Sequence, residues 1–328
     1  MLNELSKNIE ELLKEQGLQG DVSDLVPLTN GASNETWKFN YIMSPSSIKM
    51  ILKKGPDTPS GGLALSKSKE ATIQSAVFNA KGPVPEVLAI SSETSNLKNA
   101  YVMELIEGES IPRKILRDDV FKDIRNSLAF QCGQAMAKIH KVSLKSLDWL
   151  KQKDVNEELE ELYLTYKNFN NPSPVFEYAF KWLKDQEFGD SQKTLVHGDF
   201  RLGNLIFDTN GLQSVVDWEL SHIGNPLQDL GWICVNSWRF GHHKKVVGGF
   251  GDINDLINGY SSIIDKQLNS NIIRNWQVLG TLRWGVICLI QTFGHLLTTT
   301  NSVERAAIGR RVSETELDLV DLLFLKGK

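Results

Sequence analysis

The stretch between Leu195 and Trp218 restricts the possible folds of this chain more than any other part of its sequence. It holds a carboxylate, Asp199, after a short apolar run, and a carboxamide, Asn204, five positions later. A strand-like run, an Asn-Gly turn and a second strand-like run then lead to another carboxylate, Asp217. Because Asn-Gly is a typical hairpin turn, the pattern folds Asp217 back beside Asn204. Two hard oxygen ligands then converge, which is the kind of site that Mg²⁺ prefers.

A lysine in the first third of the chain is a second candidate for the same site. Lys53 ends a predicted apolar strand that begins at Ile48, and side-chain alternation turns Lys54 to the opposite face. A helix predicted over residues 66–80 carries Glu70 near its start. An ammonium group at the strand end can hold nucleotide phosphates, and an ion pair with Glu70 would fix its orientation. Lys54 remains the alternative phosphate ligand.

The order of predicted elements divides the chain into two unlike parts. After an amphipathic N-terminal helix, we predict strands at Leu25–Thr29, Thr36–Met43, Ile48–Lys53, Val87–Ile90 and Ala100–Leu105. Helices dominate afterwards, and we predict them at Asp118–Lys141, Asn156–Asn168, Pro174–Phe188 and from Leu227 onward. The sequence therefore predicts an α+β fold of two lobes. Residues 1–106 form an antiparallel β-sheet lobe with one main helix, and residues 107–328 form a larger, mostly helical lobe.

Composition and charge argue against several classes of protein. The net charge is −4 at pH 7 and the pI is about 5.9, which does not suit a nucleic-acid-binding protein. The cysteines Cys132, Cys234 and Cys288 lie in apolar, helix-like runs and are expected to be buried thiols. The sequence shows neither an apolar run long enough for a membrane span nor the basic start of a secretory signal. We expect a cytoplasmic protein that is monomeric or homodimeric.

Taken together, these motifs resemble those of the aminoglycoside phosphotransferase and choline kinase family, whose fold is that of the eukaryotic protein kinases. The strings HGDFRLGNLIFD, VVDWE and GNPLQDLGW are especially similar to a branch whose members are sometimes fused to acyl-CoA dehydrogenases. The resemblance covers about residues 22–325. It implies an ATP- and Mg²⁺-dependent phosphotransferase that moves the γ-phosphate to a hydroxyl group of a small molecule.

The resemblance also implies roles for three residues of the central segment. Asp199 would accept or orient the proton of the attacking hydroxyl. Asn204 and Asp217 would bind Mg²⁺. Arg201 departs from the family pattern, because many members carry histidine at this position, and we expect it to neutralise charge on the transferring phosphoryl group.

Neighbouring residues are expected to support this segment. The resemblance implies that His197 packs and hydrogen-bonds within the loop instead of acting as a base. It likewise implies that Asp229 anchors the loop by accepting its amide hydrogens. Trp232 and Trp238 are expected in the core, where either can also line a pocket for the acceptor.

For the nucleotide, the resemblance places Lys53 at the α- and β-phosphates, with Glu70 as its ionic partner. Glu104 and Ile106 would belong to the hinge that presents backbone groups to adenine. The loop Asn30–Asn34 would cover the phosphates, with Asn34 as a candidate contact. This loop has one glycine where protein kinases have three, and no long activation loop follows the metal aspartate. These departures favour a small-molecule acceptor over a protein.

The sequence leaves the acceptor open. The acidic run from Glu157 to Glu161 suits a polycation such as an aminoglycoside, but it is also typical of a solvated helix face. The branch resemblance points equally to a hydroxyacyl-CoA or a hydroxy acid. Two further alternatives are a catalytically silent nucleotide-binding protein and a metal-dependent hydrolase that uses His197, Asp199 and Asp217. The hydrolase alternative gives no role to Lys53 and Glu70.

Overall fold

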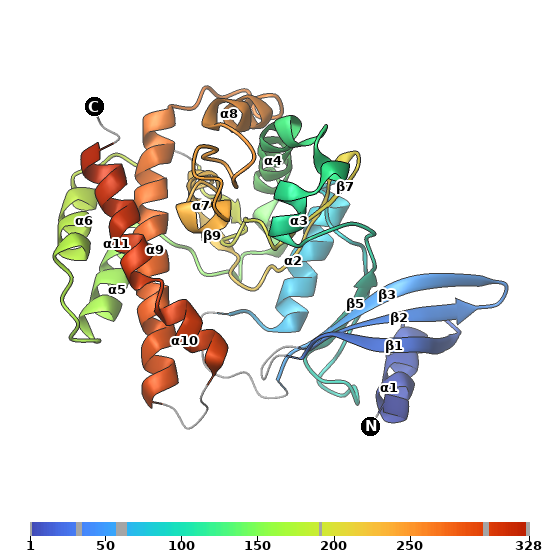
Figure 1. Cartoon of the computed structure of the whole chain (residues 1–328). Coiled ribbons are helices and arrows are strands. Elements are labelled where there is room, and N and C mark those ends of the chain that lie inside the picture. Colours follow the sequence, from blue (N-terminus) through green and yellow to red (C-terminus); the bar gives the residue numbers. More distant parts are fainter. Residues whose placement is uncertain (1, 31–34, 57–63, 190–191, 298–301, 326–328) are drawn as a thin grey trace.

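The protein consists of an antiparallel sheet followed by a larger group of helices (Figure 1). The computed structural model describes residues 2–30, 35–56, 64–189, 192–297 and 302–325. Strands gather in the N-terminal part and helices in the C-terminal part, so the predicted α+β organisation is confirmed.

The N-terminal sheet has five antiparallel strands in the order β1-β2-β3-β5-β4. Their bounds are β1 (Asp21–Asn30), β2 (Glu35–Met43), β3 (Ser46–Lys54), β4 (Val87–Ile90) and β5 (Ala100–Glu104). Each corresponds to a predicted strand, but β1 begins earlier than Leu25. The register of β1 shifts between Ser23 and Val26, and Asp24 there has a φ of 52°. This irregularity interrupts the alternation by which a strand is recognised in sequence.

The two faces of the sheet pack against different helices. On one face, Phe39, Tyr41 and Met50 form a buried cluster with residues of α1 (Leu2–Glu15), namely Ile9, Leu12 and Leu13. On the other face, Ile51 and Tyr101 pack with Ala71 of α2 (Lys67–Asn79). Lys53 is opposite Tyr101 in the pairing of β3 with β5, which places it on the α2 face. The alternation argument for Lys53 is therefore confirmed.

The C-terminal part is built around the long helix α9, which contacts α7, α10 and α11. The α-helices of this part are α3 (Pro112–Arg117), α4 (Arg125–His140), α5 (Val155–Lys167), α6 (Pro174–Lys184), α7 (Leu227–Trp232), α8 (Ile253–Ser261), α9 (Ser270–Leu297), α10 (Val303–Gly309) and α11 (Val312–Val320). The three cysteines are buried in these helices or beside them, as expected. Helices α4 and α8 approach closely at Gly133, where a Cβ atom would lie 2.2 Å from the carbonyl oxygen of Leu256.

The single helix predicted over Asp118–Lys141 is wrong at its start. The chain forms the short helix α3, then a 3₁₀ turn at Asp119–Phe121, and only then α4. Asp118 has an extended backbone, with φ −73° and ψ 137°. The guanidinium of Arg125 donates to the carbonyl oxygens of Ile115 and Asp118, so a side chain satisfies acceptors that a continuous helix would satisfy internally.

Two small sheets carry the central motif. One pairs β6 (Thr194–Val196) with β9 (His222–Gly224), and the other pairs β7 (Leu205–Asp208) with β8 (Gly211–Val215). The β7–β8 hairpin is as predicted, whereas β9 was not predicted. Three residues give too little pattern for a strand to be recognised, and the pairing partner of β9 lies far away in sequence.

The sheet ends with β5 at Glu104, close to the expected boundary at residue 106. The division of the chain into lobes 1–106 and 107–328 stays a prediction. Within the described ranges, no helix combines the length and the apolar character that a membrane crossing requires.

Candidate active site

A buried carboxylate holds the loop that follows β6. Asp229, in α7, accepts hydrogen bonds from the backbone N–H groups of His197 at 2.8 Å and Gly198 at 2.9 Å. His140 Nε2 lies 3.1 Å from the same carboxylate, and Nδ1 lies 3.1 Å from the hydroxyl of Tyr260. Burial alone would raise the pKa of Asp229, but the hydrogen bond with His140 and the nearby backbone donors hold it below its ordinary value. The predicted anchoring role is confirmed.

The turn at Gly198 requires a glycine. Its φ is +82°, and a Cβ atom would lie 2.4 Å from the carbonyl oxygen of Leu220. The buried ring of His197 packs against Trp218 at 4.6 Å, and Nε2 lies 3.2 Å from the carbonyl oxygen of Val216. Burial lowers the pKa of His197, so its ring is neutral at pH 7. These contacts confirm that His197 packs and bonds within the loop.

Three donors hold the carboxylate of Asp199. Asn204 Nδ2 donates to Oδ2 at 2.7 Å, while Arg201 Nε and Trp232 Nε1 donate to Oδ1 at 2.9 and 2.8 Å. The side chain is 13% exposed, so solvent still reaches it. A carboxylate fixed in this way keeps a defined direction for its remaining lone pairs, which suits a group that orients a hydroxyl.

Aromatic rings form the wall beside this carboxylate. Trp232 and Trp238 are buried, as expected, with ring centroids 5.3 Å apart. The guanidinium of Arg201 lies over the ring of Trp238, 4.7 Å from its centroid. The bond from Trp232 to Asp199 was not predicted. No local pattern in the sequence indicates this bond, because the two residues lie 33 positions apart.

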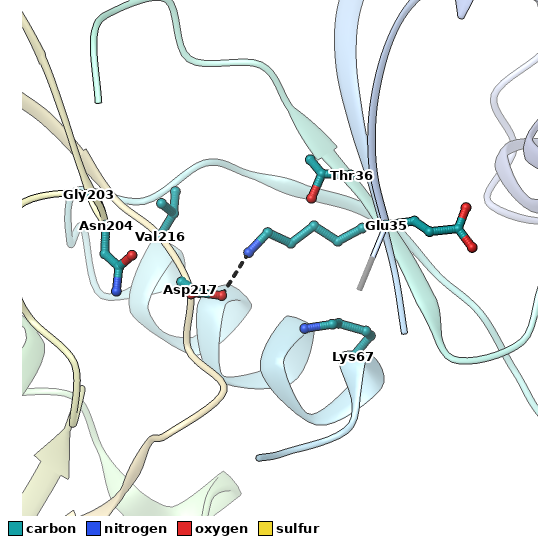
Figure 2. Close-up of a pocket in the computed structure, with 8 residues that line it drawn as sticks. Glu35, Thr36, Lys67, Gly203, Asn204, Val216 and Asp217 are labelled. Atoms are coloured by element: carbon teal, nitrogen blue, oxygen red, sulfur yellow. Dashed lines mark hydrogen bonds and ion pairs between the residues drawn. The ribbon is translucent and has the colours of Figure 1, made fainter. Parts of the chain in front are cut away.

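Asn204 and Asp217 line a cavity of about 260 Å³ between β3, the start of α2 and the β7–β8 hairpin (Figure 2). The amide nitrogen of Asn204 is bonded to Asp199, which leaves its oxygen for another partner. Lys53 Nζ lies 3.1 Å from Asp217 Oδ1. Burial alone would raise the pKa of Asp217, but Lys53 holds it below its ordinary value.

The donor atoms of this cavity fit a hard divalent cation. Figure 2 shows the amide oxygen of Asn204 turned toward Asp217, so an amide oxygen and a carboxylate face one space. Oxygen ligands of these two kinds suit Mg²⁺, which keeps water or phosphate oxygens in its other positions. Among the described residues, no group of three or more His, Cys, Asp or Glu side chains forms a metal site.

The expected ion pair between Lys53 and Glu70 is wrong for this structure. Glu70 is fully buried in α2, and its Oε1 accepts from the ammonium of Lys67, one turn earlier in the same helix. Lys53 is engaged by Asp217 instead. Lys67 was missed because a lysine at the start of a helix is normally solvated, whereas this one is 4% exposed. Lys54, the alternative phosphate ligand, pairs with Glu35.

A second cavity of about 340 Å³ adjoins the first. Its lining combines apolar side chains of both parts of the chain with the hinge, namely Leu28, Ile51, Met103, Glu104, Leu105, Ile106 and Ile206. The backbone N–H of Glu104 donates to the carbonyl oxygen of Glu86, and that of Leu105 donates to the carbonyl oxygen of Lys49. The predicted hinge residues Glu104 and Ile106 both line this mainly apolar cavity, and their contact with adenine stays a prediction. Asn34, the predicted loop contact, lies outside the described residues.

A sheet with a lysine on its third strand, a loop with Asp199 and a hairpin that ends at Asp217 together define a protein-kinase-like phosphotransferase fold. The chain belongs to the phosphotransferase enzyme family, whose family model matches residues 24–262. The resemblance drawn from the sequence motifs is thereby confirmed.

Individual relatives agree with this assignment. Acyl-CoA dehydrogenase family member 10 of Mus musculus is 31% identical over 243 residues, which cover 69% of this chain and 22% of that protein. The chain thus spans about a fifth of that relative's length. A candidate aminoglycoside phosphotransferase from Ralstonia eutropha superposes with a TM-score of 0.73 at 19% identity, covering 96% of this chain and 97% of that one.

A structure of a thermostable mutant of aminoglycoside phosphotransferase APH(4)-Ia, in a ternary complex with ADP and hygromycin B, gives a TM-score of 0.63 at 15% identity. It covers 97% of this chain and 99% of that one. At these identities the two structural likenesses show the fold, and they confirm the predicted protein-kinase-like architecture.

Proposed function

We propose that this phosphotransferase moves the γ-phosphate of ATP to a hydroxyl group of a small molecule, with Mg²⁺ as its metal. The observation that carries the proposal is the Asp199 carboxylate, fixed by three donors beside the cavity of Asn204 and Asp217. ADP in the related hygromycin B complex supports ATP as the donor. The paired cavities offer an apolar part for a purine and a charged part for its phosphates.

Each residue contributes by position and charge. Asp199 accepts a hydrogen bond from the acceptor hydroxyl and takes its proton as the new P–O bond forms, while the bond from the γ-phosphorus to the β–γ bridging oxygen breaks and ADP leaves. Arg201, next to Asp199, stabilises charge on the phosphoryl oxygens. Asn204 and Asp217 would hold Mg²⁺, which neutralises phosphate charge when bound. Lys53, already at the Asp217 carboxylate, is within the same cavity and would contact the phosphates.

The replacement Asp199→Ala tests the proposal. Binding of Mg-ATP should persist, and turnover should fall at least about a hundredfold, because the proton acceptor is lost. ADP release is measured across a panel of aminoglycosides, choline-like amines, sugars and hydroxyacyl compounds. Asp148→Ala is the matched control, since Asp148 is an exposed acid of the C-terminal part and should change little. Equal turnover in wild type and Asp199→Ala would remove Asp199 from the mechanism.

The same screen separates the alternatives. Nucleotide binding without ADP release for any acceptor, in a single-turnover experiment, would favour a catalytically silent protein. Hydrolysis without nucleotide would favour the hydrolase.

A specific observation favours a hydroxy acid or another anionic acceptor as the second candidate. Arg283 lies over the ring of Trp232, 5.2 Å from its centroid, and that indole donates to Asp199. Lys153 is close enough to Arg283 that burial and this neighbouring charge lower the pKa of Lys153 to about 8. Their shared acid is Glu158, 3.6 Å from Arg283. Two cations around one acid suit an incoming anionic group.

The contacts of the acidic run of α5 are typical of a solvated helix face. Glu157, Glu160 and Glu161 are exposed, and Glu161 pairs with Lys151 at the surface. Glu158 is partly buried and is already engaged by Arg283. These contacts support the solvated-face interpretation of this run over a binding role.

Lys153→Met tests the anionic acceptor. It should raise the KM for a hydroxy acid about tenfold or more, because a charge-assisted contact is lost, and leave the KM for ATP unchanged. Turnover of aminoglycosides but not of hydroxy acids, with no effect of Lys153→Met, would refute this candidate.

A further inference from the structure

Lys67 is a buried cation of the phosphate cavity with no role so far in the proposed function. Its side chain is 5% exposed and lines the same wall as Lys53 and Asp217 (Figure 2). Its ammonium contacts Glu70 and lies 3.8 Å from Oε2 of Glu219. Figure 2 shows the side chain extending from the first turn of α2 toward Asp217.

The position of this lysine opposes the local preference of a helix. Lys67 follows the N-cap Ser66, so it lies at the positive end of the dipole of α2, where a cation is disfavoured. Its backbone N–H donates to Asn99 Oδ1 at 2.8 Å, which fixes the base of the side chain. A buried cation at the unfavourable end of the helix dipole indicates that positive charge is required at the cavity.

Glu70 holds Lys67 at the cavity. Its Oε1 accepts from the ammonium of Lys67, whereas its Oε2 is buried and lacks a hydrogen-bond partner. The ammonium of Lys53 is paired with Asp217 instead, so Lys67 is the cation that Glu70 positions.

The charges of the cavity also call for both lysines. Two lysines, Lys53 and Lys67, and two acids, Glu35 and Asp217, line the cavity. Without Lys67 the phosphates would meet two acids and one lysine, which is unfavourable for a polyanion.

We propose that Lys67 is a second phosphate-binding lysine, which Glu70 holds at the cavity wall when a nucleoside triphosphate is bound. This inference rests on the proposed function, because it concerns the same nucleotide site. It assigns to the first residue of α2 a contact with the β- or γ-phosphate.

Calorimetric titration of wild type and Lys67→Met with Mg-ATP, Mg-ADP and adenosine tests the inference. Lys67→Met should weaken Mg-ATP binding about tenfold or more, as expected for one charge-assisted contact, and change adenosine binding less than about twofold. Lys69→Met is the matched control, since it removes an exposed lysine from the same helix turn and should bind all three ligands like wild type.

A purely structural role for Lys67 predicts a different result. It would leave the ratio of Mg-ATP affinity to adenosine affinity unchanged in Lys67→Met, and that outcome would overturn the inference. Should Lys67→Met fold poorly because Glu70 loses its partner, Glu70→Gln and Lys67→Met/Glu70→Gln provide the same comparison without the buried acid. If the ratio of Mg-ATP affinity to adenosine affinity is the same in Glu70→Gln and in Lys67→Met/Glu70→Gln, the inference is also overturned. Absence of nucleotide binding by wild type would instead refute the proposed function itself.

Discussion

Replacing Asp229 by asparagine should destabilise the protein and loosen its catalytic loop. The two carboxylate oxygens accept from the N–H groups of His197 and Gly198 and contact the ring of His140, all in the fully buried interior. An asparagine side chain has one acceptor oxygen and one NH₂ group. Whichever way it turns, its NH₂ group faces at least one backbone N–H that can only donate.

The magnitude follows from these contacts. One buried N–H left without an acceptor costs about 1–3 kcal/mol. The remaining bonds change from charge-assisted to neutral and lose roughly 1 kcal/mol each. Asp229→Asn should therefore lower the free energy of unfolding by about 3–5 kcal/mol, in the range measured when one partner of a buried ionic network is removed. For a chain of 328 residues, that corresponds to a fall in Tm of roughly 4–7 °C.

The assay is equilibrium unfolding in urea, followed by far-UV circular dichroism and by tryptophan fluorescence. Asp148→Asn is the matched control and should stay within about 0.5 kcal/mol of wild type, because Asp148 is exposed. If Asp229→Asn lowers the free energy of unfolding by less than about 1 kcal/mol, the reasoning that this carboxylate anchors the catalytic loop is refuted.

Three further predictions concern packing and charge. Gly133→Ala should cost about 1–3 kcal/mol in unfolding free energy, because its Cβ atom would lie 2.2 Å from the carbonyl oxygen of Leu256; stability equal to wild type would contradict the close approach of α4 and α8. Burial raises the pKa of Glu70 to about 7, so folding favours the protonated form and wild-type stability falls as the pH rises from about 4.5 through 7. Glu70→Gln should therefore gain about 2–3 kcal/mol relative to wild type between pH 5 and pH 8, and a pH-independent difference would argue against it. With an anionic acceptor, KM should rise as the pH increases through about 8, where Lys153 loses its proton, and Lys153→Arg should abolish that rise.

The sequence was most informative where local pattern and chemistry coincide. The Asn-Gly turn and the apolar runs around it predicted the hairpin that brings Asp217 to Asn204, and the structure places both at one cavity. Alternation along β3 predicted the face of Lys53. Each of these inferences needs only a few neighbouring residues and the period of a strand.

The errors arose where burial and individual side-chain contacts determine the structure. The helix break at Asp118 depends on the guanidinium of Arg125. Glu70 pairs with Lys67 because both are buried together, and burial of a helix-start lysine leaves no periodic signal. The bond from Trp232 to Asp199 joins residues that are distant in sequence, so no local pattern indicates it.

The central claim is that Asn204 and Asp217 converge on a magnesium ion that faces a bound nucleotide. Calorimetric titration of ATP into wild type and Asp217→Ala, with and without Mg²⁺, measures this directly. The account predicts that Mg²⁺ strengthens ATP binding to wild type and has no such effect on Asp217→Ala, while adenosine binding stays the same in both. An equal effect of Mg²⁺ on the two proteins would contradict it.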